Sequence, residues 1–159
     1  MNKKNTLILG VGNPLRRDDG AGPETVRVLT QEKKHAGLYE KADIIDGGTD
    51  GLGLVEYFRD YKKIILIDAV QMDLPPGSVK TFSPDKAVIT IKTDSLSTHG
   101  FGIAELLKLA EALELQPDVT IIGIQPEDTG YGENLSGTVL SSIDTVIKTI
   151  YTILSAPKQ

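Results

Sequence analysis

The feature that most constrains the fold is a set of short runs in which apolar residues occupy consecutive positions. Ile64-Ile65-Leu66-Ile67 is the clearest of them. Successive side chains of a strand point to opposite faces, so such a run predicts a strand buried on both faces, as in a parallel sheet covered by helices. By the same reasoning strands are predicted at residues 6–11, 43–46, 63–70, 87–92 and 119–124.

The segments between these runs show helical spacing of apolar residues. Residues 103–113 and 139–154 each carry apolar side chains on one helical face. A further helix is predicted to begin around residues 20–23, because Pro23 suits a first helical turn, and a shorter one after Asp50. The alternation of strands and helices predicts a layered α/β domain with a mostly parallel sheet, to which residues 79–82 add a strand.

Size and composition limit the classes of protein that need to be considered. The 159 residues suit one domain, 1–159. The formal net charge of −5 argues against non-specific nucleic-acid binding, and the absence of cysteine excludes disulfides, a thiolate nucleophile and Cys-ligated metal clusters. No window approaches the ~20 apolar residues of a membrane span. We therefore expect neither a nucleic-acid nor a membrane partner, and a cytoplasmic location.

The glycine-rich segment after the first predicted strand, residues 10–22, invites comparison with nucleotide-binding loops. It matches them poorly. The third glycine of G-x-G-x-x-G is replaced by Leu15, and the charges of Asp18 and Asp19 would repel a pyrophosphate. No P-loop motif is present. We therefore expect no nucleotide cofactor.

Carboxylates and one imidazole follow the strands that would meet at one edge of such a sheet. Asp19, Asp68 and His99 form a mixed oxygen and nitrogen set of the kind that suits borderline divalent ions such as nickel or zinc. Other interpretations stay open at this point: Asp19 as a solvated or helix-capping carboxylate, His99 as an ordinary loop histidine, and Asp19 with Asp68 as a glycosidase-type pair. A serine triad around Ser97 is disfavoured, because no G-x-S-x-G motif is present. The second histidine, His35, is predicted to be an exposed bystander.

The segment Gly10-Val-Gly-Asn-Pro-Leu-Arg-Arg-Asp-Asp-Gly-Ala-Gly-Pro23 resembles the opening motif of the hydrogenase maturation endopeptidases, which trim the large subunit of [NiFe] hydrogenases. Asp46-Gly-Gly-Thr49, Ile67-Asp-Ala69, Thr98-His99 and Gly123-Ile-Gln-Pro126 agree with the family in type and order. The resemblance implies a three-layer α/β fold with a twisted, mostly parallel five-stranded sheet between helices.

The resemblance also implies a function. Members of the family remove a C-terminal extension from the large-subunit precursor after nickel insertion, and the three positions that meet the nickel match Asp19, Asp68 and His99 here. The first of them is Glu in some members. We expect the nickel to arrive on the precursor, with no tightly bound metal in the isolated protein, and Asp19, Asp68 and His99 to serve as both metal-contacting and catalytic residues. Asn13 and the Asp46–Thr49 segment are expected to shape the cleft.

Several points stay open on the sequence alone. Either a metal-activated water or a carboxylate acting as general base could carry out the hydrolysis. The rival interpretations are a peptidase of the same fold with another substrate, and a non-catalytic nickel-sensing or chaperone module that binds the loaded precursor without cutting it.

Overall fold

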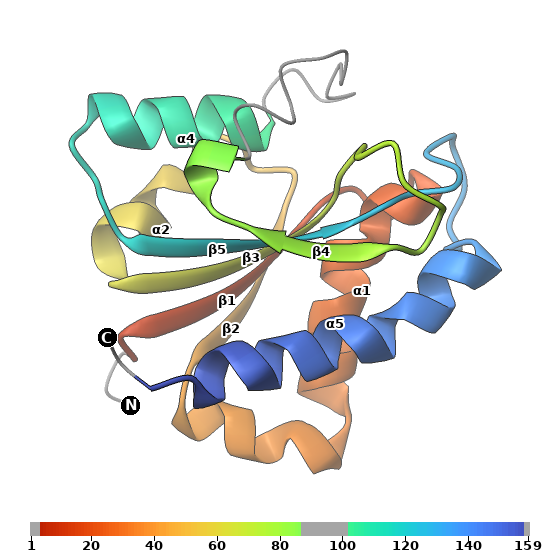
Figure 1. The fold of residues 1–159 in the computed structure, drawn as a ribbon, viewed down its shortest axis with the longest axis horizontal. Coiled ribbons are helices and arrows are strands. Elements are labelled where there is room, and N and C mark those ends of the chain that lie inside the picture. Colours follow the sequence, from red (N-terminus) through yellow and green to blue (C-terminus); the bar gives the residue numbers. More distant parts are fainter. Residues whose placement is uncertain (1–3, 87–101, 158–159) are drawn as a thin grey trace.

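The computed structural model describes residues 4–86 and 102–157 (Figure 1). In chain order the elements are β1 (Thr6–Val11), the 3-10 helix η1 (Arg17–Gly20), α1 (Ala21–Gln31), the 3-10 helix η2 (Lys33–Glu40), β2 (Asp43–Gly48), α2 (Val55–Asp60), β3 (Lys63–Ala69), β4 (Val79–Phe82), α4 (Ile103–Ala112), β5 (Asp118–Ile124) and α5 (Gly137–Ser155).

The five strands form one sheet in the order β2-β1-β3-β5-β4. β2, β1, β3 and β5 run parallel, and β4 pairs antiparallel with β5 at the edge. The predicted fold class, a mostly parallel five-stranded sheet between helices, is therefore confirmed. The strand predicted at residues 87–92 lies outside the described residues.

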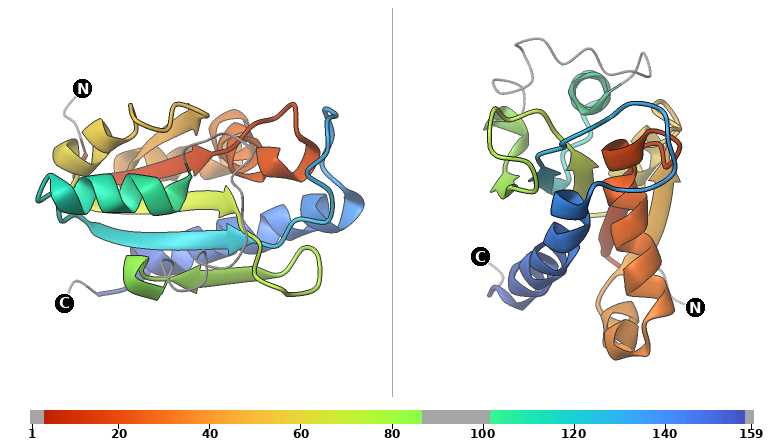
Figure 2. Two further views of the ribbon diagram at one scale, coloured as in Figure 1. Left: turned by 90° about the horizontal axis from the view of Figure 1, so that it is seen from above. Right: turned by 90° about the vertical axis from the view of Figure 1, so that its right-hand side faces the viewer.

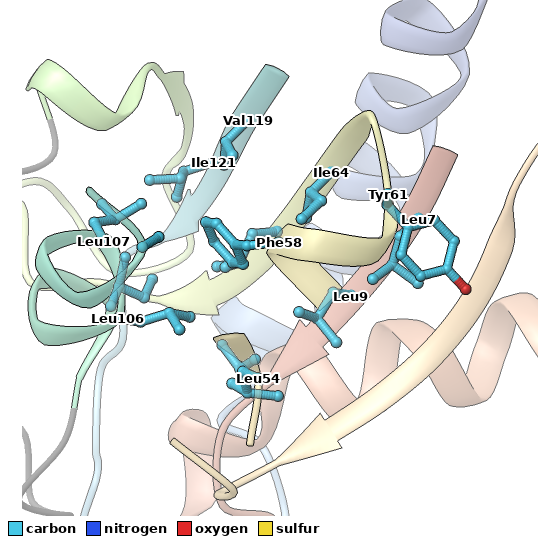
Figure 3. Packing of buried hydrophobic residues seen from close by; sticks show 14 residues of the cluster. Leu7, Leu9, Leu54, Phe58, Tyr61, Ile64, Leu106, Leu107, Val119 and Ile121 are labelled. Carbon is cyan, nitrogen blue, oxygen red and sulfur yellow. The ribbon is translucent and has the colours of Figure 1, made fainter. Parts of the chain in front are cut away.

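Helices cover both faces of the sheet, which explains the consecutive apolar positions in its strands. Alternate residues of β1 and β3, such as Leu9 and Leu66, face the side covered by α2 and α4 (Figure 3). The intervening residues, such as Ile8 and Ile65, face the side covered by α1 and α5. All of these side chains are fully buried. Two separate apolar layers thus fix the central strands, and the ends of those strands are placed accurately relative to one another.

Two glycines let the first helix start in direct contact with the sheet. A Cβ on Gly22 would lie 2.5 Å from the Ile67 carbonyl oxygen of β3. Gly12 has a φ of +137°, which glycine adopts readily, and a Cβ there would collide with the Asp19 carbonyl. The glycine-rich segment therefore serves close packing between η1, α1 and the ends of β1 and β3.

The prediction that His35 is an exposed bystander is wrong. In η2 its side chain is buried, with 5% of the residue exposed, and Nδ1 lies 3.0 Å from the Tyr151 hydroxyl of α5. The polar sequence around His35 gave no sign of this contact, because α5 reaches it from more than 100 residues further along the chain.

None of the helices within residues 4–86 and 102–157 is long and apolar enough to cross a membrane.

Candidate functional site at the carboxyl edge of the sheet

The parallel strands all end at one edge of the sheet, and acidic residues gather there. Asp18 and Asp19 lie in η1, which follows β1, while Asp68 is the penultimate residue of β3. Figure 2 shows the start of α1 and the β5–α5 loop (residues 125–136) side by side at this edge. In open α/β sheets this edge is the usual place for a ligand site.

Asp19 is held at the start of the helix by its own turn. Its backbone N–H donates to the Arg16 carbonyl at 3.0 Å, and one carboxylate oxygen accepts from the Asn13 backbone N–H at 2.9 Å. The Asn13 side chain in turn accepts from the Leu15 N–H at 2.9 Å. The side chain of Asp19 is partly exposed. The Asn13 backbone N–H therefore helps to orient the Asp19 carboxylate. The expected part of Asn13 in shaping the substrate cleft stays a prediction.

Asp68 lies at the end of the central strand β3, between β1 and β5, where its register partner in β5 is Gly123. It is partly buried. Its removal from water raises the pKa of the Asp68 carboxyl well above the ordinary value, and the nearby charge of Asp19 raises it further. The two carboxylates are thus electrostatically coupled. An added cation would relieve the repulsion between them.

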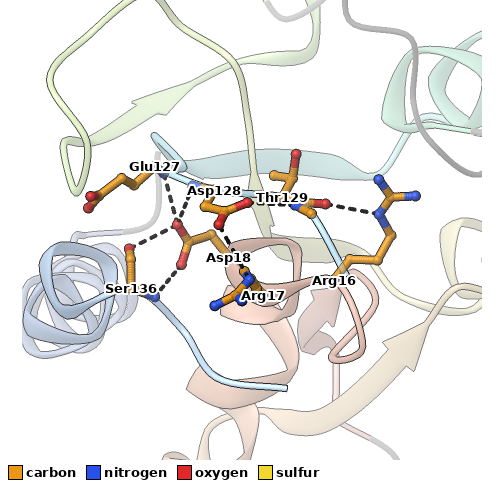
Figure 4. Close-up of polar contacts among 8 residues, drawn as sticks. Arg16, Arg17, Asp18, Glu127, Asp128, Thr129 and Ser136 are labelled. Atoms are coloured by element: carbon orange, nitrogen blue, oxygen red, sulfur yellow. Dashed lines mark hydrogen bonds and ion pairs between the residues drawn. The ribbon is translucent and has the colours of Figure 1, made fainter. Parts of the chain in front are cut away.

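Asp18, the neighbour of Asp19, is fully buried, and its carboxylate faces the β5–α5 loop (Figure 4). One carboxylate oxygen accepts from the backbone N–H groups of Glu127 and Asp128, at 2.8 and 2.9 Å, and from the Ser136 hydroxyl at 2.9 Å. The other accepts from the Ser136 N–H at 2.7 Å. Burial alone raises the pKa of Asp18, but these hydrogen bonds outweigh it and hold the pKa below its ordinary value.

Asp18 therefore fastens the β5–α5 loop to η1. Ser136 is also the N-cap of α5, where its hydroxyl accepts from the Val139 N–H at 3.4 Å. The sequence assigns Asp19 to the metal site but does not predict that Asp18 anchors the loop. The only signal for it is that adjacent residues of a tight turn cannot direct both side chains to the same side.

Gln125 is a second positioning residue that the sequence analysis did not single out. It is buried at the end of β5, with 3% of the residue exposed. Its side-chain oxygen accepts from the Met72 N–H at 2.7 Å, and its amide nitrogen donates to the Gln71 side chain at 3.1 Å. These bonds fix the segment that leaves β3 just after Asp68. A polar residue at the end of an apolar strand, in Gly-Ile-Gln-Pro, was the available signal.

His99, Ser97 and Thr98 lie outside the described residues, so the structure does not place them relative to the carboxylates. Among residues 4–86 and 102–157, no three acidic or histidine side chains come together as a metal-binding group. Of the predicted set, the described part of the chain brings together Asp19 and Asp68 only.

A cleft of about 440 Å³ lies around the start of α1 on the same edge. It is bordered by residues of η1, α1, the end of β2, the β5–α5 loop and the first turn of α5. The lining residues include Arg17, Gly20, Glu24, Asp46, Leu135 and Leu140. Asp46 is among them, whereas Asp19 and Asp68 are not, so the expected part of the Asp46–Thr49 segment in shaping a cleft at the carboxylates stays a prediction.

The fold and this edge together define an α/β protein of the class that carries its chemistry beyond the carboxyl ends of parallel strands. Comparison with known proteins identifies the family. The family model described as hydrogenase maturation protease matches residues 25–153. The chain therefore belongs to the hydrogenase maturation protease family, and the resemblance stated from its motifs is confirmed.

Individual relatives agree with this assignment. The hydrogenase expression/formation protein HupD of Rhizobium leguminosarum bv. viciae is 33% identical over 150 residues, which cover 93% of this chain and 73% of HupD. The hydrogenase maturating endopeptidase HybD from E. coli superimposes with a TM-score of 0.78 at 27% identity, over 94% of this chain and 91% of HybD. The [NiFe] hydrogenase maturation protease HybD from Thermococcus kodakarensis gives 0.75 at 29%, over 95% and 99%.

Proposed function

We propose that this protein is the endopeptidase that removes the C-terminal extension of a [NiFe] hydrogenase large-subunit precursor after nickel insertion. The nickel belongs to the substrate and arrives with it. Asp19, Asp68 and His99 meet that nickel when the precursor docks. Membership of the hydrogenase maturation protease family supports the reaction class.

One structural observation carries the assignment of the carboxylates. Asp19 and Asp68 come from different elements, yet they lie close enough for the charge of one to raise the pKa of the other. Two coupled carboxylates at a strand end cost free energy when both are ionised, and a divalent cation removes that cost. Oxygen ligands combined with one imidazole suit a borderline ion such as nickel. His99 completes the set in the proposal.

This arrangement provides a check on the state of the substrate. A precursor without nickel would cover two like charges and bring no cation to compensate them, so its docking would be weaker. A loaded precursor gains the metal contacts. The protease would therefore discriminate by differential binding and not by a separate sensor.

Hydrolysis needs an activated water and a proton donor for the leaving amine. The raised pKa of Asp68 makes its carboxylate a stronger base than an ordinary aspartate, so it can accept a proton from water and return one to the amine. The substrate's nickel can alternatively lower the pKa of a bound water. The carboxylate route and the metal-bound water route use the same residues. The dependence of the cleavage rate on pH, measured for the wild type and for variants of these residues, distinguishes the two routes.

The decisive experiment is cleavage followed by mass spectrometry, with purified large-subunit precursor prepared nickel-loaded and nickel-free. We expect loss of the C-terminal extension only from the loaded precursor. Cleavage of both preparations would contradict the nickel check. Stable binding of the loaded precursor without cleavage would instead indicate a chaperone module, and cleavage of unrelated peptides alone would indicate a peptidase with another substrate.

Variants test the three proposed residues in the same assay. His99→Ala should abolish processing and leave the melting temperature unchanged. Asp19→Asn should do the same, since it keeps the acceptor for the Asn13 N–H but loses the charge. Asp73→Asn is the matched control, because Asp73 is exposed and follows Asp68 by five residues in the chain. Normal processing by His99→Ala would overturn the three-residue assignment.

A further inference from the structure

Two large apolar side chains are exposed beside the carboxylate site. Tyr131 is 82% exposed and Leu15 is 62% exposed. Leu15 lies four residues before Asp19, and Tyr131 lies in the β5–α5 loop that Asp18 fastens to η1. Exposed apolar residues that stand singly are common, but a pair held together beside a functional site is a sign of an interaction surface.

The backbone holds these two residues next to each other. The Gly132 N–H donates to the Leu15 carbonyl at 2.9 Å, and the Arg17 N–H donates to the Gly132 carbonyl at 3.0 Å. The two segments thus pair in parallel at Arg16 and Gly132. Leu15 and Tyr131 are the preceding residues of the paired segments, so their side chains are displayed at neighbouring positions.

Arg16 adds a third component. Its Nε donates to the Thr129 carbonyl at 3.0 Å (Figure 4). Its guanidinium lies 4.8 Å from the centre of the Tyr131 ring. Arg16 therefore contacts the aromatic ring and is itself held by its hydrogen bond to Thr129. A tyrosine beside an arginine is the composition found where binding energy concentrates in protein interfaces.

We propose that Leu15, Arg16 and Tyr131 form a docking patch for the folded surface of the precursor protein, separate from the carboxylates that meet its metal. This inference rests on the proposed function. A metal that reaches Asp19 on a protein substrate brings that protein over the same loop, because Leu15 and Asp19 are joined by one short, hydrogen-bonded turn. The partner surface it fits is apolar, with hydrogen-bond acceptors facing the guanidinium.

The cleft around the start of α1 lies next to the patch. Pro14 and Arg17, which flank the patch in sequence, line that cleft together with Leu140. A projecting side chain of the partner can enter the cleft while its flat surface covers Leu15 and Tyr131. Recognition of the folded protein and recognition of its metal are thereby divided between neighbouring parts of one edge.

The test compares the double variant Leu15→Ser/Tyr131→Ser with the control Leu113→Ser/Tyr39→Ser. Leu113 and Tyr39 are also exposed, at 52% and 45%, but Leu113 follows α4 and Tyr39 lies in η2, and these segments lead into β5 and β2 at the opposite edge of the sheet. With nickel-loaded precursor we expect the patch variant to raise KM about tenfold or more and to keep kcat within about twofold. The control and Tyr131→Phe should resemble the wild type.

An unchanged KM in the patch variant, with normal cleavage by the wild type, would overturn the docking patch and leave the proposed function intact. A control variant whose kcat and KM change as much as those of the patch variant would also overturn it. If the wild type does not cleave, the test is the binding of nickel-loaded precursor to immobilised protein. Weaker binding by the patch variant than by the wild type supports the patch. Equal binding by the two proteins, or no binding by the wild type, refutes it. Melting temperatures of all variants should match within about 2 °C, because the changed side chains are exposed.

Discussion

Asp18 and Asp19 are neighbours in the chain, but the regions that surround them differ in a basic way. Asp18 sits where η1 meets the β5–α5 loop, fully buried, and accepts hydrogen bonds at both oxygens. Asp19 faces the end of β3, where the second carboxylate, Asp68, lies within range of its charge. The pKa of Asp18 is lowered by its surroundings and that of Asp68 is raised.

The difference separates a structural charge from the one to which we assign a functional role. The folded protein favours the ionised form of Asp18, so this carboxylate contributes to stability. It disfavours the ionised form of Asp68, so that carboxylate is held at a cost. Groups held at a cost are characteristic of sites that bind or react, because a ligand or a proton can recover the free energy.

The largest expected effect separates these two regions by activity. Asp68→Asn should reduce cleavage of nickel-loaded precursor by about a thousandfold or more, because it removes a group that, in the proposed function, meets the metal or takes up a proton. The free energy of unfolding, measured by urea titration at neutral pH, should not fall. A variant that loses stability and keeps its activity would reverse the assignment of the two regions.

Asp18→Asn should show the opposite pattern. The substituted amide cannot accept every hydrogen bond that the carboxylate accepts, and a buried donor is left without a partner. We expect the free energy of unfolding to fall by about 2 kcal/mol. Asp46→Asn is the control, since Asp46 is exposed and an asparagine can accept the same Gly48 N–H bond. An Asp18→Asn protein as stable as the control would show that the hydrogen bonds contribute nothing net.

The pH dependence of stability should have opposite signs in the two regions. The folded-state pKa of Asp18 lies below 3.8. Its contribution to the free energy of unfolding is therefore complete above pH 3.8 and is lost as the pH falls through the folded-state pKa. The folded-state pKa of Asp68 lies above 3.8, so its contribution is complete below pH 3.8 and is lost as the pH rises through the raised value. Urea titrations from about pH 3 to about pH 8 check both.

In these titrations, the difference between wild type and Asp18→Asn should shrink at the acid end. Asp68→Asn should gain on the wild type toward neutral pH. Parallel curves for both variants would contradict the separation.

The smallest effect is expected at the surface of the fastened loop. Arg17 and Asp128 form an ion pair at 3.3 Å, with side chains 45% and 54% exposed. Solvent screens such a pair, so Arg17→Gln should change the free energy of unfolding by less than about 0.5 kcal/mol. A double-mutant cycle with Asp128→Asn measures the pair alone. A coupling of 2 kcal/mol or more would show that the loop depends on the ion pair as much as on Asp18 (about the value expected there).

Much of the fold could be predicted because its causes are local. The run Ile64–Ile67 predicts a doubly covered strand, and it is the central strand β3. The stripe in residues 139–154 predicts the helix α5, whose buried residues Val139, Ile143 and Ile147 keep that spacing. Periodicity reports which faces are buried, and this is settled over a few turns of chain.

The site was predictable in part. The sequence singles out Asp19 and Asp68 because Asp19 follows one predicted strand and Asp68 lies near the end of another, and strand ends of a parallel sheet share an edge. The resemblance selects Asp19 over Asp18, but the sequence gives Asp18 no role of its own, misses Gln125 and places His35 on the surface. In each case the deciding partner comes from another part of the chain: Ser136 for Asp18, Met72 for Gln125 and Tyr151 for His35.

By itself the sequence determined the alternation of strands and helices, the family, and the candidate residues of the site. Only the tertiary structure showed that Asp18 is held by hydrogen bonds to a distant loop and that Asp68 is coupled to Asp19 at the sheet edge. The physical reason is range. Burial patterns and turns depend on neighbours along the chain, whereas the ionisation of a carboxylate depends on donors, charges and solvent that only the folded chain brings near.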